Sequence, residues 1–179
     1  MLETDRLILR EWRAEDADAL YVLAADPDVG LSTGWPPHTS VENSRQVIKD
    51  VLSVPENYAV VLKSSGELLG CMGAHPHKDL GGVETDEKEL GYWIGKPFWG
   101  NGYAPEAGRA LLLHLFKDLG EKACWCCHYD NNDKSRRVIE KLGFRYVATD
   151  PEHPTLLGYT RVSLMYRLTA EEFLGESDA

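Results

Sequence analysis

The stretch that decides the fold reads Glu89-Leu-Gly-Tyr-Trp-Ile-Gly-Lys-Pro-Phe-Trp-Gly-Asn-Gly-Tyr-Ala-Pro-Glu-Ala107. Its first six residues are typical of a strand, and from Tyr103 onward an amphipathic helix is predicted. Between them, Gly100 and Gly102 allow a tight turn close to a ligand, and the helix N-terminus directs unpaired amides to the same place. The segment therefore predicts a binding site for a phosphate or pyrophosphate.

The two glycines alone are equally consistent with an ordinary turn or helix cap, because both structures use glycine often. The common nucleotide fingerprints do not fit. The chain lacks G-x-x-x-x-G-K-[ST], and Pro105 stands where G-x-G-x-x-G needs its third glycine. The two glycines thus need support from the rest of the chain.

Length, charge and composition narrow the class of protein. The chain has 179 residues, with 19 Lys and Arg against 29 Asp and Glu, a formal net charge of −10, and 43% hydrophobic residues. These values predict one domain over residues 1–179 that needs neither disulfides nor a metal to form a core. The acidic balance argues against nucleic acid as a partner, because phosphates attract basic surfaces.

The N-terminus and the apolar segments indicate where the protein acts. Residues 1–5 lack the basic and apolar regions of a signal peptide, and the longest apolar stretch, residues 111–116, is too short to span a membrane. We therefore expect a cytoplasmic protein that does not enter a membrane.

The four cysteines are not spaced as a metal site. Cys124, Cys126 and Cys127 lie together without the paired C-x-x-C spacing of zinc sites, and Cys71 is far away in sequence. On a strand, Cys124 and Cys126 would share one face and Cys127 the other, so the three could not converge on one ion. We expect buried, reduced thiols and no metal.

Hydrophobic periodicity predicts alternating strands and helices, which indicates an α+β fold with a largely antiparallel sheet. Strands are expected over residues 7–10, 58–63, 68–74, 89–94, 123–129, 144–148 and 159–168, and helices over 17–24, 103–119 and 134–142. Another helix should follow a capping box at Thr39–Glu42, with Val47, Ile48, Val51 and Leu52 inward. Loops are expected over 28–37 and beyond Asp150 with Pro151 and Pro154, a loop or hairpin end over 75–86, and a short helix in the tail from Thr169.

Several motifs together resemble the GNAT superfamily of acetyl-CoA-dependent N-acetyltransferases, and within it the RimJ/RimL-type branch. The resemblance covers nearly the whole chain. It implies a mixed, largely antiparallel sheet flanked by helices, with two strands splayed around acetyl-CoA as cosubstrate. The matching segments are Glu3–Arg10 with Glu15-Asp16, Gly91–Ile94, Gly100–Ala107, Asn132–Ser135 and Glu140–Phe144.

The resemblance also implies which residues hold acetyl-CoA. The superfamily loop begins with Gln or Arg, and Trp99 departs from this pattern, which removes a polar contact but leaves the backbone amides. Asn132 is expected to contact the cofactor arm, although a plain helix cap is an equally natural role for it. The backbone of Trp93 and Ile94 is expected to bind the pantetheine amides, and the expected pyrophosphate loop consists of Trp99, Gly100, Asn101, Gly102, Tyr103 and Ala104.

Two side chains are expected to serve the reaction. Glu89 is the candidate general base, acting directly or through water, and the alternative is an exposed acid in an acidic stretch. Ser135 matches a serine that the branch places at the departing sulfur and so counts as both catalytic and cofactor-binding, with a polar residue at a helix N-terminus as the alternative. The basic residues Lys134, Arg136, Arg137, Lys141 and Arg145 form either a 3′-phosphate site or a solvated helix face.

The acceptor is less defined than the donor. Fold analogy places Trp35, His38 and Tyr159 at the acceptor end of the site. An N-terminal α-amine of a protein or peptide is the first expectation, and a polyamine or antibiotic amine is the second. An acetyl-CoA sensor without turnover is a third, and a homodimer is possible because dimers are frequent in the branch.

Overall fold

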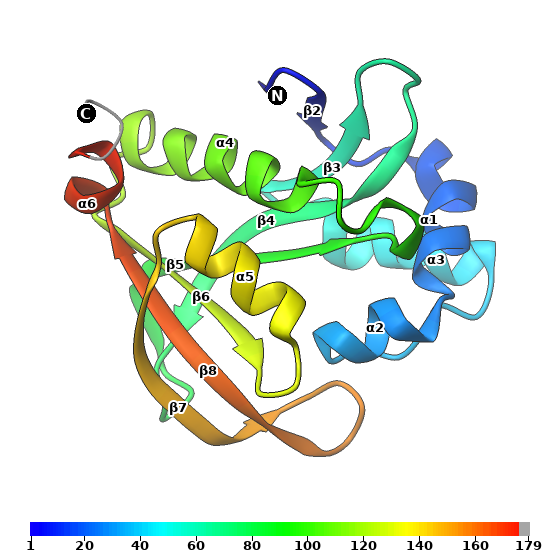
Figure 1. Cartoon of the computed structure of the whole chain (residues 1–179). Coiled ribbons are helices and arrows are strands. Elements are labelled where there is room, and N and C mark those ends of the chain that lie inside the picture. Colours follow the sequence, from blue (N-terminus) through cyan, green and yellow to red (C-terminus); the bar gives the residue numbers. More distant parts are fainter. Residues whose placement is uncertain (176–179) are drawn as a thin grey trace.

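The computed structural model describes residues 1–175, and within them one eight-stranded sheet forms the centre of the fold (Figure 1). The strands are β1 (Leu2–Glu3), β2 (Leu7–Arg10), β3 (Asn57–Leu62), β4 (Leu68–Lys78), β5 (Glu84–Ile94), β6 (Ala123–Tyr129), β7 (Arg145–Pro154) and β8 (Thr160–Thr169). The helices are α1 (Ala17–Ala24), α2 (Pro27–Thr33), α3 (Val41–Val47), α4 (Tyr103–Lys117), α5 (Asp133–Lys141) and α6 (Ala170–Gly175). Short helical segments η1 (Ala14–Asp16), η2 (Ile48–Leu52) and η3 (Lys96–Phe98) connect them.

The strand order is β1-β2-β3-β4-β5-β6-β8-β7, and the neighbours are antiparallel except for the parallel pair β5 and β6. This pair is short. It joins Lys88–Leu90 to Cys124–Cys126, although β5 continues to Ile94 and β6 to Tyr129. The two strands therefore separate beyond Leu90, which confirms the expected splay.

Two hydrophobic cores lie on opposite faces of the sheet. One core packs α4 and α5 against the sheet through Leu111, Leu115 and Ile139. The other packs α1 and η2 against β3 and β4 through Leu20 and Ile48. Figure 1 shows α4 and α5 over the sheet and α1, α2 and α3 grouped together at one side. In the part of the sheet formed by β5 to β8, α4 and α5 cover one face.

The cysteine-bearing strand alternates as expected. Cys124 and Cys126 are buried in the core under α4, and Cys127 points to the opposite face, where it is half-buried. The four cysteines are free thiols. In residues 1–175, no group of three His, Cys, Asp or Glu side chains is arranged to hold a metal.

No helix in that part of the chain has the length and apolar character needed to cross a membrane.

Three local expectations were wrong. The expected loop over residues 28–37 begins with α2, because Pro27 starts this helix under an Asp26 cap instead of only ending α1. The expected loop at Pro151 and Pro154 is part of β7, an edge strand with register shifts, where proline is tolerated. Val51 is 58% exposed, because η2 is a π-helix, whose wider turn changes which side chains face inward.

Other elements agree with the periodicity. The hairpin of β3 and β4, the strand β6 and the helices α4 and α5 lie where they were expected. The expected capping box at Thr39–Glu42 is displaced by one residue, because the cap of α3 is Ser40, which accepts a hydrogen bond from the Asn43 backbone amide at 3.0 Å. The tail forms α6 through Gly175, and the expectation for residues 176–179 lies outside the described residues.

Candidate active site

The loop before α4 has the geometry of an anion site. Gly100 and Gly102 have φ angles of 80° and 79°, in the left-handed region that favours glycine. Gly102 is the N-cap of α4, and among the described residues no side chain caps its first amides. A Cβ on Gly100 would meet no described atom within 4 Å, so the loop faces open space. These features fit a pyrophosphate held by backbone amides.

The N-terminal strands hold this loop in place. Arg6 donates from Nη1 to the Asn101 carbonyl at 3.1 Å and pairs with Glu106 at 2.6 Å. Thr4 donates its hydroxyl proton to Glu106 at 2.5 Å. The Asn101 side chain donates back to the carbonyls of Phe98 and Trp99, at 3.0 and 3.3 Å. The expected role of Asn101 is therefore limited to its backbone.

An alanine at position 100 tests the loop directly. Gly100→Ala forces a side chain into a left-handed conformation, at a cost of about 1–2 kcal/mol, and fills space that a ligand needs. We expect the KM for acetyl-CoA to rise about tenfold. Gly66→Ala is the matched control, because Gly66 also has a positive φ of 73° and open surroundings within the described structure. Equal KM values for the two variants, measured in the same assay, would contradict a ligand-binding role for the loop.

Trp99, which departs from the family pattern, closes the end of β5. Its indole Nε1 donates to the Ile94 carbonyl at 2.6 Å, and the Lys134 ammonium lies 3.8 Å from its ring centroid. The indole therefore occupies a carbonyl that was expected to serve pantetheine. The Ile94 amide is not involved in this contact.

The open edge of β5 does not present Trp93 as expected. The Trp93 carbonyl oxygen faces β4. This oxygen is so close to Gly70 of β4 that a Cβ atom added to Gly70 would lie 2.1 Å from it. Gly95 also donates to Leu69 on β4, at 2.8 Å. Since backbone groups alternate along a strand, Tyr92 and Ile94 face the gap toward β6 instead. The Trp93 backbone therefore does not face the gap as expected, whereas the Tyr92 backbone does, and Trp93 is among the residues that line the cavity.

One cavity of about 2070 Å³ runs along β5 between the glycine loop and the β4–β5 hairpin. Near the glycine loop it is lined by Lys134, Arg137 and Lys141 of α5. Arg136 and Arg145 pair with Asp133 and Glu172, so the basic cluster divides into two parts. At the other end the lining includes both acidic and basic side chains, namely Asp79, Asp150, Glu152, Lys78, His75 and His153.

Ser135 lies in this cavity against a tyrosine that the sequence analysis did not select. The Oγ of Ser135 is 2.8 Å from the phenol oxygen of Tyr92. Burial raises the pKa of Tyr92 well above its usual value, so the phenol stays protonated and can donate to Ser135. Alternation along β5 could have found Tyr92, but its contact with α5 depends on the fold.

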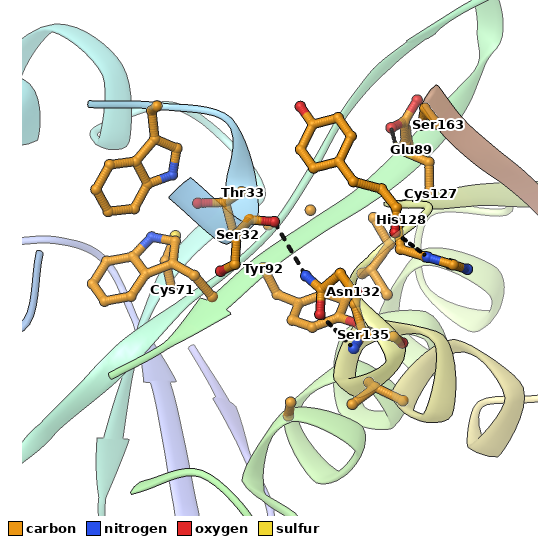
Figure 2. A pocket seen from close by; sticks show the side chains of 18 of the residues that line it. Ser32, Thr33, Cys71, Glu89, Tyr92, Cys127, His128, Asn132, Ser135 and Ser163 are labelled. Atoms are coloured by element: carbon orange, nitrogen blue, oxygen red, sulfur yellow. Dashed lines mark hydrogen bonds between the residues drawn. The ribbon is translucent and has the colours of Figure 1, made fainter. Parts of the chain in front are cut away.

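Asn132 caps α5, which was one of its two expected roles. Its Oδ1 accepts the Ser135 amide at 3.1 Å, and its Nδ2 donates to the Ser32 carbonyl of α2 at 3.1 Å (Figure 2). The amide group thus fixes Ser135 and joins α5 to α2. A contact between Asn132 and the cofactor arm would use its remaining hydrogen-bonding capacity.

Glu89 is not the exposed acid of the alternative interpretation, because its side chain is only 16% exposed. Oε2 lies 2.9 Å from His77 Nδ1, and Oε1 accepts the Cys127 thiol at 3.0 Å. Burial alone would raise the pKa of Glu89. The hydrogen bonds from His77 and Cys127 oppose this effect, and the pKa of Glu89 lies below its ordinary value. The carboxylate is therefore ionised at neutral pH and faces the cavity, beside Cys127 in Figure 2.

The three residues expected at the acceptor end of the site lie in different surroundings. Trp35 lines the cavity and contacts Trp93 edge to face, with ring centroids 5.9 Å apart. His38 packs behind Trp35 and bonds Ser44 at 2.8 Å, and burial lowers its pKa. Tyr159 is 54% exposed. Neither His38 nor Tyr159 is among the described residues that line the cavity, so Trp35 alone of the three is brought to it.

Fold and site together define a class of protein in which a gap between β5 and β6 forms part of one cavity with a glycine loop suited to an anion. The family model described as "Acetyltransferase (GNAT) domain" matches residues 6–145, so the chain belongs to the GNAT family and is an N-acetyltransferase. Family membership implies acetyl-CoA as the donor and an amine as the acceptor.

Individual proteins agree with this assignment. "Uncharacterized N-acetyltransferase p20" of Bacillus licheniformis is 27% identical over 97% of this chain and 98% of that protein. "Putative ribosomal N-acetyltransferase YdaF" of Bacillus subtilis is 32% identical over 62% of this chain and 58% of that protein. The crystal structure of a GNAT-family acetyltransferase from Bacillus anthracis has a TM-score of 0.83 at 22% identity, and the match covers 96% of this chain and 100% of that one. This structural match shows the shared fold.

Proposed function

We propose that the protein acetylates the N-terminal α-amine of a protein or peptide, as expected for a RimJ/RimL-type enzyme. The observation that carries this proposal is the Glu89 carboxylate, which lines the cavity and is held by His77 at 2.9 Å and by the Cys127 thiol at 3.0 Å. These hydrogen bonds lower the pKa of Glu89, which makes it a weak base. A weak base favours an acceptor that loses its proton easily. An α-amine has a pKa near 8 and lysine one near 10.4, so forming neutral lysine at pH 7 costs about 3 kcal/mol more. The name of the YdaF protein, which mentions ribosomal acetylation, supports the same acceptor class.

In this proposal, the chain holds the donor mainly through its backbone. Amides of Gly100–Ala104 bind the pyrophosphate, and backbone groups of Tyr92 and Ile94 bind the pantetheine arm. Lys134, Arg137 and Lys141 line the cavity where a 3′-phosphate would lie. The bound cosubstrate supplies an acetyl group activated as a thioester.

Two side chains move or stabilise charge. Glu89 attracts the acceptor ammonium and takes one of its protons, directly or through a water, so that the neutral nitrogen can attack. Ser135, whose Oγ lies 2.8 Å from the Tyr92 phenol oxygen, donates a hydrogen bond to the departing sulfur and keeps its own proton. The nitrogen attacks the thioester carbonyl, the carbon–sulfur bond breaks, and the second proton of the nitrogen passes to the departing thiolate. The products are an N-acetylated amine and the free thiol of CoA, and Glu89 releases its proton to solvent.

A small polycationic amine is the second candidate acceptor, because Asp79, Asp150 and Glu152 line the far part of the cavity. These carboxylates would attract the several charges of a polyamine. The same carboxylates would also attract a basic peptide, so charge alone does not distinguish a polyamine from a peptide acceptor.

Thiol release from acetyl-CoA tests the proposal. The purified protein is assayed with N-terminal peptides whose lysines are blocked, with spermidine, and with an aminoglycoside. We expect release with the peptides. A response to spermidine or the aminoglycoside alone would move the function to small-amine acetylation. Absence of release across the panel, with calorimetric binding of CoA, would contradict the proposed acceptor and point to an amine outside the panel.

A further inference from the structure

A buried histidine stands behind the proposed base. His77 is 2% exposed and borders a second, smaller cavity of about 380 Å³ instead of the acceptor cavity. Its Nδ1 lies 2.9 Å from Glu89 Oε2. Because an ionised carboxylate can only accept hydrogen bonds, Nδ1 carries the proton. The imidazole is therefore a donor to Glu89 that has no contact with the acceptor cavity in the described structure.

The imidazole is held in a fixed orientation. It stacks on Trp125 with ring centroids 4.3 Å apart and an interplanar angle of 7°. The Trp125 indole donates to Glu87, and Arg167 also donates to Glu87, at 2.9 Å from Nε. A chain of contacts from β8 through β5 and β6 thus fixes the ring that touches Glu89. The imidazole plane is thus held by Trp125 on its face and its Nδ1 by Glu89.

Strand geometry brings these groups onto one face. His75 lies opposite Glu89 in the β4–β5 ladder, and His77 lies two residues further along β4, on the same face. Trp125 is the register partner of Glu89 on β6. The register between β4 and β5 shifts between Pro76 and Lys78, beside His77.

We propose that His77 is a positioning residue, which orients the Glu89 carboxylate and keeps it ionised for acceptor deprotonation. This inference rests on the proposed function, because it gives Glu89 its role as a base. His77 does not touch the substrate and is not itself a catalytic residue.

Other charged or titratable groups lie around His77 and Glu89. They are His75 on β4, Asp79 after it, Glu87 on β5, Cys127 on β6, Asp150 on β7 and Arg167 on β8. Glu87 is neutralised by Arg167. The Cys127 thiol remains protonated, because burial raises its pKa well above the ordinary value. His77 and Cys127 are therefore the two direct hydrogen-bond donors to Glu89 in residues 1–175.

Two variants of His77 separate positioning from packing. His77→Phe keeps an aromatic ring against Trp125 but removes the N–H that donates to Glu89. Without this hydrogen bond, we expect the effect of burial to raise the pKa of Glu89. A base works only while ionised, so the acid limb of kcat/KM moves to higher pH, by about one to two units. His77→Asn offers an N–H near the position of Nδ1 and should restore an acid limb close to that of the wild type.

The matched control is His114→Asn on α4, which removes a histidine that pairs with Glu56 and Asp118 outside both cavities. We expect its pH profile to match the wild type. Thermal unfolding of each variant verifies that the chain is folded. An acid limb that stays in place in His77→Phe, or that shifts equally in His77→Asn, would overturn the proposal.

A second readout does not depend on turnover. The carboxyl carbon of Glu89 is followed by carbon-13 NMR during an acid titration of the protein without ligands, with Glu89→Gln to assign the signal. His77→Phe should raise the titration midpoint of Glu89, and an unchanged midpoint would overturn the inference. If the wild type acetylates no amine, the proposed function fails while this titration still decides the role of His77.

Discussion

Glu89→Gln is expected to lower kcat at pH 7 by about 10²- to 10³-fold with the favoured amine. Glutamine keeps the size of the side chain but has no negative charge and cannot take a proton from the acceptor. The cavity then presents a neutral group where the acceptor ammonium has to be held and deprotonated. Because the glycine loop is unchanged, the KM for acetyl-CoA should stay within about twofold.

Steady-state kinetics with both substrates varied provide the measurement. Glu84→Gln is the matched control, since Glu84 is an exposed acid at the start of the same strand. Its kcat should equal that of the wild type. Glu89→Gln with wild-type kcat and normal thermal stability would mean that another group or bulk water accepts the proton, and the proposed role of Glu89 would be wrong.

Ser135→Ala gives the second large effect, a decrease in kcat of about ten- to a hundredfold. The hydroxyl meets developing negative charge on the departing sulfur, so its loss costs more in the transition state than in the bound donor complex. Tyr92→Phe removes the phenol that bonds to Ser135 and should lower kcat in the same direction by a smaller factor. The two effects should be less than additive, because both changes act on one hydrogen-bonded pair.

The comparison of kcat with KM decides this prediction. Ser53→Ala, at an exposed serine after η2, is the control for the loss of a hydroxyl and should have wild-type kinetics. If Ser135→Ala raises the KM for acetyl-CoA as much as it lowers kcat, Ser135 serves in binding instead.

Local patterns predicted much of the fold. The alternation in Ala123–Tyr129 and the apolar stripe of Tyr103–Lys117 are contained within one element each, so sequence alone locates them. α2 was missed because Pro27 fits both the end of one helix and the first turn of the next. The signal that favours the second role is local, because Asp26 stands directly before Pro27 and its side chain accepts the Asp28 amide at 2.9 Å.

The site was predicted in part. The glycine loop follows from conformational rules that act on a few neighbouring residues, and Glu89 and Ser135 were selected through motifs. The orientation of the Trp93 backbone depends on its pairing with β4, which the motif does not contain. His77 reaches Glu89 only through the pairing of β4 with β5, so no spacing in the sequence indicates it.

Polar groups were the hardest to predict. For Asn132 the sequence left two roles open, a contact with the cofactor arm or a helix cap, and its side-chain amide caps α5 and bonds to Ser32. His38 likewise bonds to Ser44 behind Trp35. Whether a polar side chain is satisfied internally depends on tertiary contacts, and these determine which groups are left for a ligand.

The most direct test uses a peptide that contains both a free N-terminal α-amine and a free lysine. The peptide is incubated with acetyl-CoA and the enzyme, and tandem mass spectrometry locates the acetyl group. The proposal of a weak base acting on an easily deprotonated amine predicts acetylation at the α-nitrogen, with none at lysine during the initial rate. Acetylation at the lysine ε-nitrogen, with an unmodified N-terminus, would contradict it.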